Sequence, residues 1–187
     1  MTPPAPRSIR GQYERLGARA FYEQCGPAYR NPHEPIIAQS LSAACQAWPL
    51  DLSHMLDLAA GSGEVTLALR ALGAGKIDGI DPFTAEAYQL RTGQAAERIG
   101  FAEIAAGALS GRQYSLIACS FALHLCEKSR LPDLCYQLAQ ISDALLILTP
   151  HKRPEIRSAW GWDLAGEQIL ERVRTPLYRK TVECIRH

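Results

Sequence analysis

The chain has 187 residues, of which 47% are apolar and 21% charged, and this suits one well-buried domain rather than two. Its 20 basic and 19 acidic side chains give a net charge of +1, which provides no general electrostatic attraction to nucleic acid. No apolar run approaches the roughly 20 residues that cross a bilayer, and the start of the chain lacks the apolar core of a signal peptide. We therefore expect a cytoplasmic protein that has no membrane partner and for which nucleic acid is a disfavoured partner.

The first part of the chain is predicted to be helical. Residues 1–7 are rich in proline and are expected to be disordered, whereas residues 8–187 form a single domain. Apolar residues at helical spacing over 8–24 predict a weakly amphipathic helix. A second helix is predicted to begin at Asn31, as its N-cap residue, and to end near Trp48.

From residue 49 onward, short apolar runs alternate with helical segments, which is typical of parallel strands joined by crossover helices. Five runs are predicted to be strands, at 54–58, 76–81, 101–105, 114–120 and 143–149. The predicted helices between them lie at about 63–72, 84–99 and 130–141.

The end of the chain has a different pattern. Residues 168–175 and 178–186 each alternate apolar with charged side chains, and Pro176 and Leu177 lie between them. This predicts an antiparallel hairpin. The expected fold class is therefore α/β, in which residues 49–187 form a doubly wound, mostly parallel sheet of seven strands that finishes in the hairpin.

Two carboxylates and a glycine turn form the most informative pattern. Asp57 ends the apolar run of the first predicted strand, and Gly61 and Gly63 then form a Gly-x-Gly turn before a helical segment. At such a turn the backbone can approach a ligand closely. Asp81 ends the second predicted strand and lies beside the same crevice if the two strands are parallel neighbours. A carboxylate in that place can bind a ribose.

Together with the residues from Ser120 to His124 and with the terminal hairpin, this pattern resembles the class I, Rossmann-like S-adenosylmethionine-dependent methyltransferases over about residues 30–187. The resemblance implies S-adenosylmethionine as the cofactor, with Asp81 accepting hydrogen bonds from both ribose hydroxyls. The cofactor-binding set that it implies is Asp57, Ala59, Gly61, Gly63, Asp81, Pro82, Gly107, Ala108, Ser120 and Phe121.

One departure from the family pattern concerns the adenine. Family members carry an acidic or amide residue after the third strand, whereas Ala105 to Leu109 offer backbone groups alone. We therefore expect main-chain groups of Gly107 and Ala108 to hold the adenine.

The resemblance also implies where the methyl acceptor lies. His124 follows the fourth predicted strand and is the candidate general base, because an imidazole titrates near neutral pH. The helices within residues 8–48 are expected to cover the acceptor site. The candidate substrate-binding residues are Tyr29, His33, His151 and Arg153. The implied enzyme transfers a methyl group to a small molecule or a protein side chain, uses no metal, and is a monomer or homodimer.

Alternative interpretations remain open. Each site residue can have a structural role alone, such as capping a helix or forming a turn. A catalytically inactive, methyltransferase-like partner subunit is one alternative function, favoured by the missing adenine-binding acid. An NAD-dependent oxidoreductase is another, but Thr66 replaces the third glycine of that motif, and Asp57 would place a negative charge near a pyrophosphate.

Overall fold

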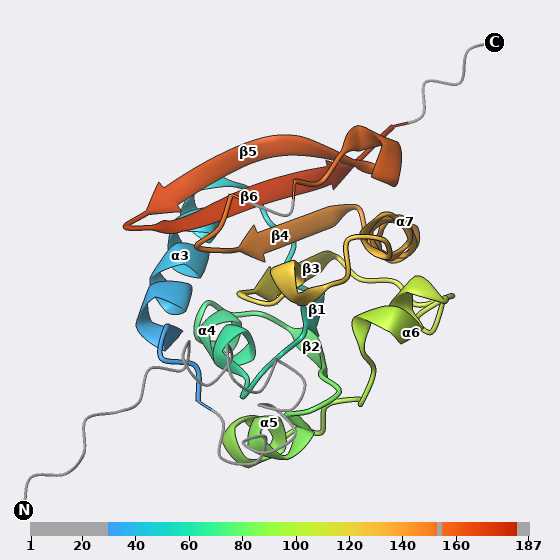
Figure 1. The fold of residues 1–187 in the computed structure, drawn as a ribbon. Coiled ribbons are helices and arrows are strands. Elements are labelled where there is room, and N and C mark those ends of the chain that lie inside the picture. Colours follow the sequence, from blue (N-terminus) through green and yellow to red (C-terminus); the bar gives the residue numbers. More distant parts are fainter. Residues whose placement is uncertain (1–29, 153–154, 183–187) are drawn as a thin grey trace, which may run out of the picture.

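A central sheet with helices on both faces forms the body of the protein (Figure 1). The computed structural model describes residues 30–152 and 155–182. The strands among them are β1 (His54–Leu58), β2 (Lys76–Ile80), β3 (Leu116–Ser120), β4 (Ala144–Leu148), β5 (Trp162–Leu170) and β6 (Val173–Lys180). Their order across the sheet is β2-β1-β3-β4-β6-β5. The first four strands are parallel, and β6 is antiparallel to both β4 and β5. The predicted α/β fold with its C-terminal hairpin is thus confirmed.

Helices cover the two faces of the sheet in pairs (Figure 1). The longer helices of the described chain are α3 (Glu34–Ala47), α4 (Glu64–Ala71), α5 (Ala85–Thr92), α6 (Phe101–Ala105) and α7 (Leu131–Ile141). Two 3-10 turns are η2 (Leu123–Leu125) and η3 (Ser158–Trp160). The α3 and α4 helices share one hydrophobic core with the sheet, and α6 and α7 share the other. This division gives the doubly wound, three-layer arrangement.

The inner parallel strands β1, β3 and β4 are buried on both faces, which explains why most of their residues are apolar, whereas β2 at the edge of the sheet begins with the exposed Lys76. Alternate residues of a strand point to opposite faces. In β1, Leu56 and Leu58 belong to the core under α6 and α7, whereas Met55 belongs to the core under α3 and α4. The apolar pattern therefore fixes both the strand and the layers around it.

The third predicted strand, 101–105, is wrong, because these residues form α6. The N–H of Gly100 donates a hydrogen bond of 3.1 Å to Oε2 of Glu103, a contact that starts a helix. Beside β2, a single parallel bridge between Ile80 and Glu97 takes the place of a full strand. Within the described residues the sheet therefore has six strands rather than the predicted seven.

The C-terminal hairpin turns earlier than predicted. Glu171 and Arg172 join β5 to β6, rather than Pro176 and Leu177. Glu171 has φ 54°, a left-handed conformation that suits a two-residue hairpin turn. Pro176 lies inside β6 opposite Glu167. The ladder to β4 is interrupted there, because proline has no N–H to donate, and pairing resumes in the bridge between Thr149 and Arg174. Both predicted strand ranges, 168–175 and 178–186, are therefore displaced.

Two helix limits also differ from the prediction. The α3 helix begins at Glu34 after His33, and Asn31 instead accepts a 2.9 Å hydrogen bond from the His33 N–H through its side chain. The predicted N-cap is therefore wrong. The α5 helix ends at Thr92 rather than near residue 99, because Gly93 adopts φ 72° and closes the helix. The predicted disordered start 1–7 and the helix over 8–24 lie outside the described residues.

No helix of the described chain is long and apolar enough to span a bilayer. The four cysteines within it, Cys45, Cys119, Cys126 and Cys135, are free thiols.

Gly79 illustrates how tightly β2 packs against α5. A Cβ atom built on Gly79 would lie 2.6 Å from the hydroxyl oxygen of Tyr88, whose side chain is fully buried. We expect Gly79→Ala to lower the free energy of unfolding in urea by about 2–3 kcal/mol. The cost should shrink in a Tyr88→Leu background, because the smaller side chain removes the clash. Equal costs in both backgrounds would contradict this explanation.

Candidate functional site

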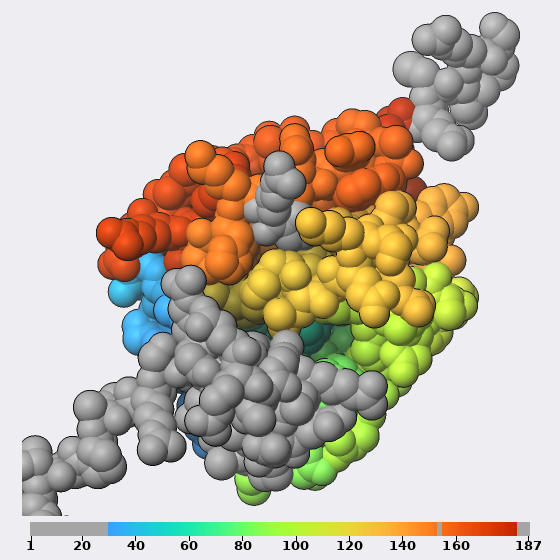
Figure 2. Space-filling model, in the orientation of Figure 1, coloured from blue at the N-terminus to red at the C-terminus, as the bar shows by residue number. Residues whose placement is uncertain are grey.

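A cavity of about 550 Å³ opens at the carboxyl ends of β1, β2 and β3. Figure 2 shows the recess between the residues that follow β3, in yellow, and the green surface around α6. A sheet of this kind binds ligands at this edge, and the volume falls in the range of small-molecule sites. Its wall is formed by Asn31, Leu58, Ala59, Ala60, Gly61, Glu64, Asp81, Pro82, Phe83, Ile99, Gly100, Phe101, Ala102, Glu103, Ser120, Phe121, Ala122, Leu125, Cys126, Glu127 and Arg130.

The turn after β1 is locked to the end of β2. Oδ2 of Asp81 accepts a hydrogen bond of 3.1 Å from the N–H of Gly61, and the Thr84 hydroxyl donates to the Gly61 carbonyl at 2.7 Å. Oδ1 of Asp81 accepts backbone N–H groups of Phe83 and Thr84 at 2.8 and 2.9 Å. Asp81 is 7% exposed and contributes to the cavity wall. The carboxylate therefore fixes the turn and also faces the cavity.

Backbone strain accompanies this turn. Gly61 has φ 58°, and Ala59 has φ 56°, which is unusual for a residue with a side chain. Strained residues of this kind cluster at functional sites. Both line the cavity, so the backbone passes close to whatever occupies it.

The strain at Ala59 can be measured. Removing the strain of a left-handed conformation stabilises the folded state by about 1–2 kcal/mol. A new glycine lowers the free energy of unfolding by about 0.4–1 kcal/mol, because it makes the unfolded chain more flexible. We therefore expect Ala59→Gly to raise the free energy of unfolding by roughly 0.5–1 kcal/mol. Ala60→Gly is the matched control, because Ala60 is not among the residues with positive φ and should lose stability. Loss of stability in both variants would argue against strain.

Asp57 lies beneath the turn rather than in the cavity wall. It is 1% exposed, and its Oδ2 accepts the Thr66 N–H at 3.1 Å and the Thr66 hydroxyl at 2.6 Å. These bonds hold the first turn of α4 against β1. Within the described chain Oδ1 of Asp57 has no hydrogen-bond partner. Burial raises the pKa of Asp57 to about 7, and the charges of Glu64 and Asp81 act in the same direction.

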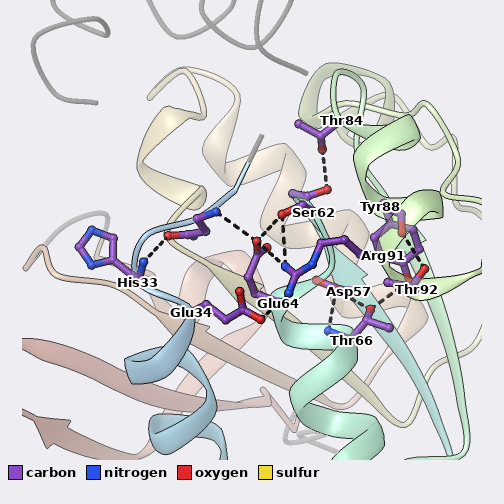
Figure 3. Close-up of polar contacts among 12 residues, drawn as sticks. His33, Glu34, Asp57, Ser62, Glu64, Thr66, Thr84, Tyr88, Arg91 and Thr92 are labelled. Atoms are coloured by element: carbon purple, nitrogen blue, oxygen red, sulfur yellow. Dashed lines mark hydrogen bonds and ion pairs between the residues drawn. The ribbon is translucent and has the colours of Figure 1, made fainter. Parts of the chain in front are cut away.

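Glu64 is the centre of a polar network at the mouth of the cavity (Figure 3). Its Oε1 accepts the Asn31 N–H and Nη1 of Arg91, each at 3.1 Å, and a short bond from the Ser62 hydroxyl. The Arg91 guanidinium also pairs with Glu34 at the start of α3. The Glu64 side chain is 3% exposed. The network thus connects α3, the glycine turn and α5.

Aromatic rings gather where β3 and β4 end. Phe121 has φ 53° and stacks on His33, with ring centroids 4.9 Å apart and planes 11° apart. The His124 and His151 rings meet edge to face at 4.8 Å. Partial burial and the charge of His151 lower the pKa of His124, which favours the neutral ring at neutral pH. His124 is not part of the cavity wall, although its neighbours Ala122 and Leu125 are.

The structure brings only part of the sequence-derived set together in the cavity. Six of these residues line it, namely Ala59, Gly61, Asp81, Pro82, Ser120 and Phe121. Gly63 has φ 89° and faces Thr92 and Tyr88 behind the turn. His33 and His151 lie beside the wall through their ring contacts. Tyr29 and Arg153 lie outside the described residues. No group of three or more potential metal ligands occurs within the described chain.

Gly107 and Ala108 do not line the cavity, because they follow α6 rather than a strand. The wall there is formed by the beginning of α6, including Phe101 and Glu103. A carboxylate is therefore present where the sequence pattern indicated backbone alone. The sequence analysis did not identify Glu103 as a wall residue, because it assigned 101–105 to a strand. The sequence reasoning also missed Glu64, whose signal was its place directly after the glycine turn.

No protein-family model matches the sequence. An uncharacterized protein of Schizosaccharomyces pombe is 31% identical to this chain in an alignment of 233 positions, gaps included, which covers 94% of this chain and 93% of the relative.

Two solved structures with a similar fold are methyltransferases. Magnesium protoporphyrin IX methyltransferase from Synechocystis, with bound SAM, matches with a TM-score of 0.58 and 16% identity, over 96% of this chain and 100% of that chain. Mitomycin 7-O-methyltransferase matches with a TM-score of 0.65 and 13% identity, over 93% of this chain and 61% of that chain. The chain belongs to one family with the S. pombe protein, and its fold is that of the class I S-adenosylmethionine-dependent methyltransferases.

Proposed function

We propose that this protein is an S-adenosylmethionine-dependent methyltransferase that acts on a small molecule or a protein side chain. The observation that carries the proposal is the cavity at the carboxyl ends of β1, β2 and β3, in which Asp81 is tied to a strained glycine turn. The solved Synechocystis neighbour is described with bound SAM. Its fold supports a donor site at the same edge of the sheet.

The residues of the cavity suit such a donor. Ala59 and Gly61 allow close approach of the backbone, and Asp81 offers carboxylate oxygens to ribose hydroxyls. Pro82 and Phe101 provide apolar surface for a planar base. When bound, the cofactor supplies a methyl group on a sulfonium that leaves as a neutral thioether. The residues of this chain bind and orient it, and alignment of the two reactants is the main catalytic requirement.

The acceptor side lies, in this proposal, next to Phe121. Residues 31–34 of the described chain support it, because Asn31 lines the cavity and His33 stacks on Phe121. The cover predicted for residues 8–48 stays a prediction, because residues 8–29 lie outside the described residues and α3 packs against the sheet together with α4. His124 acts as general base if the acceptor carries a proton, because its lowered pKa leaves a neutral nitrogen available. A thiolate or a soft ring nitrogen needs no base.

Two measurements test the proposed function. Calorimetry should detect binding of S-adenosylmethionine and S-adenosylhomocysteine, and no binding of NADH. Transfer of a radiolabelled methyl group from the cofactor into fractions of a cell extract should then identify the acceptor. Cofactor binding without transfer into any fraction would favour the inactive partner subunit. Absence of cofactor binding would overturn the proposal.

A further inference from the structure

The charges around the glycine turn are mostly negative. The charged residues of the cavity wall are Glu64, Asp81, Glu103, Glu127 and Arg130. The last two pair with each other at 3.1 Å on the exposed rim. The remaining three carboxylates have no cationic partner among the wall residues. The described cavity therefore has an acidic wall.

The cation behind the wall does not neutralise it. Arg91 contacts Glu64 at 3.1 Å, but the same guanidinium also pairs with Glu34 (Figure 3). Two carboxylates therefore share one guanidinium, and Asp81 adds a further negative charge held by backbone N–H groups. Opposite charges attract strongly in such a partly buried place, where water screens poorly.

Asp57 lies below the turn and is affected by the same negative charges. Its Oδ1 is fully buried without a partner in the described chain, and the charges of Glu64 and Asp81 both act on it. The charge of Asp57 also acts on Tyr88 of α5 and on Cys119 of β3, and neither of these side chains carries a positive charge. Burial and these charges raise the pKa of Asp57 to about 7. A cation in the cavity would relieve the repulsion.

We propose that the acidic wall selects a positively charged ligand, so that the sulfonium donor binds more tightly than its neutral thioether product, and that Glu64 is a main determinant of this preference. The inference rests on the proposed function, because it concerns the same site. S-Adenosylmethionine carries one more positive charge than S-adenosylhomocysteine, and the two otherwise differ by a methyl group. A site with this preference releases its product easily.

The first test compares three ligands by calorimetry: S-adenosylmethionine, S-adenosylhomocysteine, and sinefungin, which carries an ammonium group near the position of the sulfonium. We expect the two cationic ligands to bind about tenfold more tightly than the thioether at low salt. Glu64→Gln should reduce this ratio severalfold, because the amide still accepts hydrogen bonds but has no charge. Glu86→Gln is the matched control, since Glu86 is exposed on α5 outside the cavity and pairs with Arg98.

The second test uses the wild-type protein alone, so it does not depend on the folding of a variant. Burial raises the pKa of Asp57 to about 7, so part of the carboxyls are protonated near neutral pH, and a bound cation should displace some of the protons. Calorimetry in buffers of different ionisation enthalpy should show more protons released by S-adenosylmethionine than by S-adenosylhomocysteine. Equal affinities and equal proton release would overturn the charge preference and leave the proposed function intact. If neither ligand binds, the proposed function itself fails.

Discussion

Replacing Asp57 with asparagine is expected to stabilise the folded protein increasingly as the pH rises, by about 3 kcal/mol more at pH 8.5 than at pH 5. Burial raises the pKa of Asp57 from 3.8 to about 7, and hydrogen bonds from Thr66 oppose this shift only in part. The folded state therefore holds a proton that the unfolded state releases. Below pH 3.8 both states are protonated, and stability falls as the pH rises from there to about 7. Above about pH 7 the ionised, buried carboxylate lowers the free energy of unfolding of the wild type by the full amount, about 4 kcal/mol.

The measurement is the difference between the unfolding free energies of wild type and Asp57→Asn in urea, followed over this pH range. If the amide of the variant changes the stability by an amount that does not depend on pH, this amount does not affect the change of the difference with pH. Glu97→Gln is the control: hydrogen bonds from Arg112, which stays charged over this pH range, hold the pKa of Glu97 below its ordinary value, although burial acts to raise it. Its difference from wild type should stay flat between pH 5 and pH 8.5. A flat difference for Asp57→Asn as well would show that the buried carboxyl ionises normally.

The strands of the parallel sheet were predictable because burial on both faces leaves a local signal. The run that forms β4 is apolar throughout, and β1 is apolar at three of its five positions; the predicted limits of both agree with the structure to within about a residue. The segment 101–105 carries a weaker signal, since a short apolar run with one acid fits either a strand or a helix. In the structure, the hydrogen bond between the Gly100 N–H and Glu103 stabilises the start of a helix in this segment. The hairpin turn was missed because neither Glu171 nor Arg172 is a usual turn residue.

In the candidate site, too, features that depend on neighbouring residues in the sequence were predictable, and features that depend on long-range packing were not. The turn at Gly61 and the carboxylate of Asp81 are each readable from a few consecutive residues, and the structure joins them by a hydrogen bond. The network around Glu64 joins Asn31 and Arg91, which are 33 and 27 residues away in the chain. Such contacts depend on how helices pack over the sheet. Local patterns therefore indicate where the cavity opens, but not the charge of its wall.

Asp81→Ala is expected to weaken the binding of S-adenosylhomocysteine tenfold to a hundredfold, if the carboxylate accepts hydrogen bonds from the ribose as we propose. A hydrogen bond to a charged acceptor contributes about 1.5–3 kcal/mol, which corresponds to such a loss. The substitution also leaves the N–H groups of Gly61, Phe83 and Thr84 without their acceptor. Stability should therefore fall together with affinity, and two further variants are needed to separate the effects.

Asp81→Asn keeps one oxygen for the backbone donors and removes the charge, whereas Thr84→Val keeps the carboxylate and removes the 2.7 Å hydrogen bond to the Gly61 carbonyl. If Asp81 contacts the ligand directly, calorimetry should show a larger loss of affinity in Asp81→Asn than in Thr84→Val, even where urea denaturation gives both the same stability. If the carboxylate acts only by fixing the turn, affinity should instead follow stability across the variants. Direct binding is favoured because Asp81 lines the cavity while it holds the turn, so one side chain shapes the site and faces its ligand.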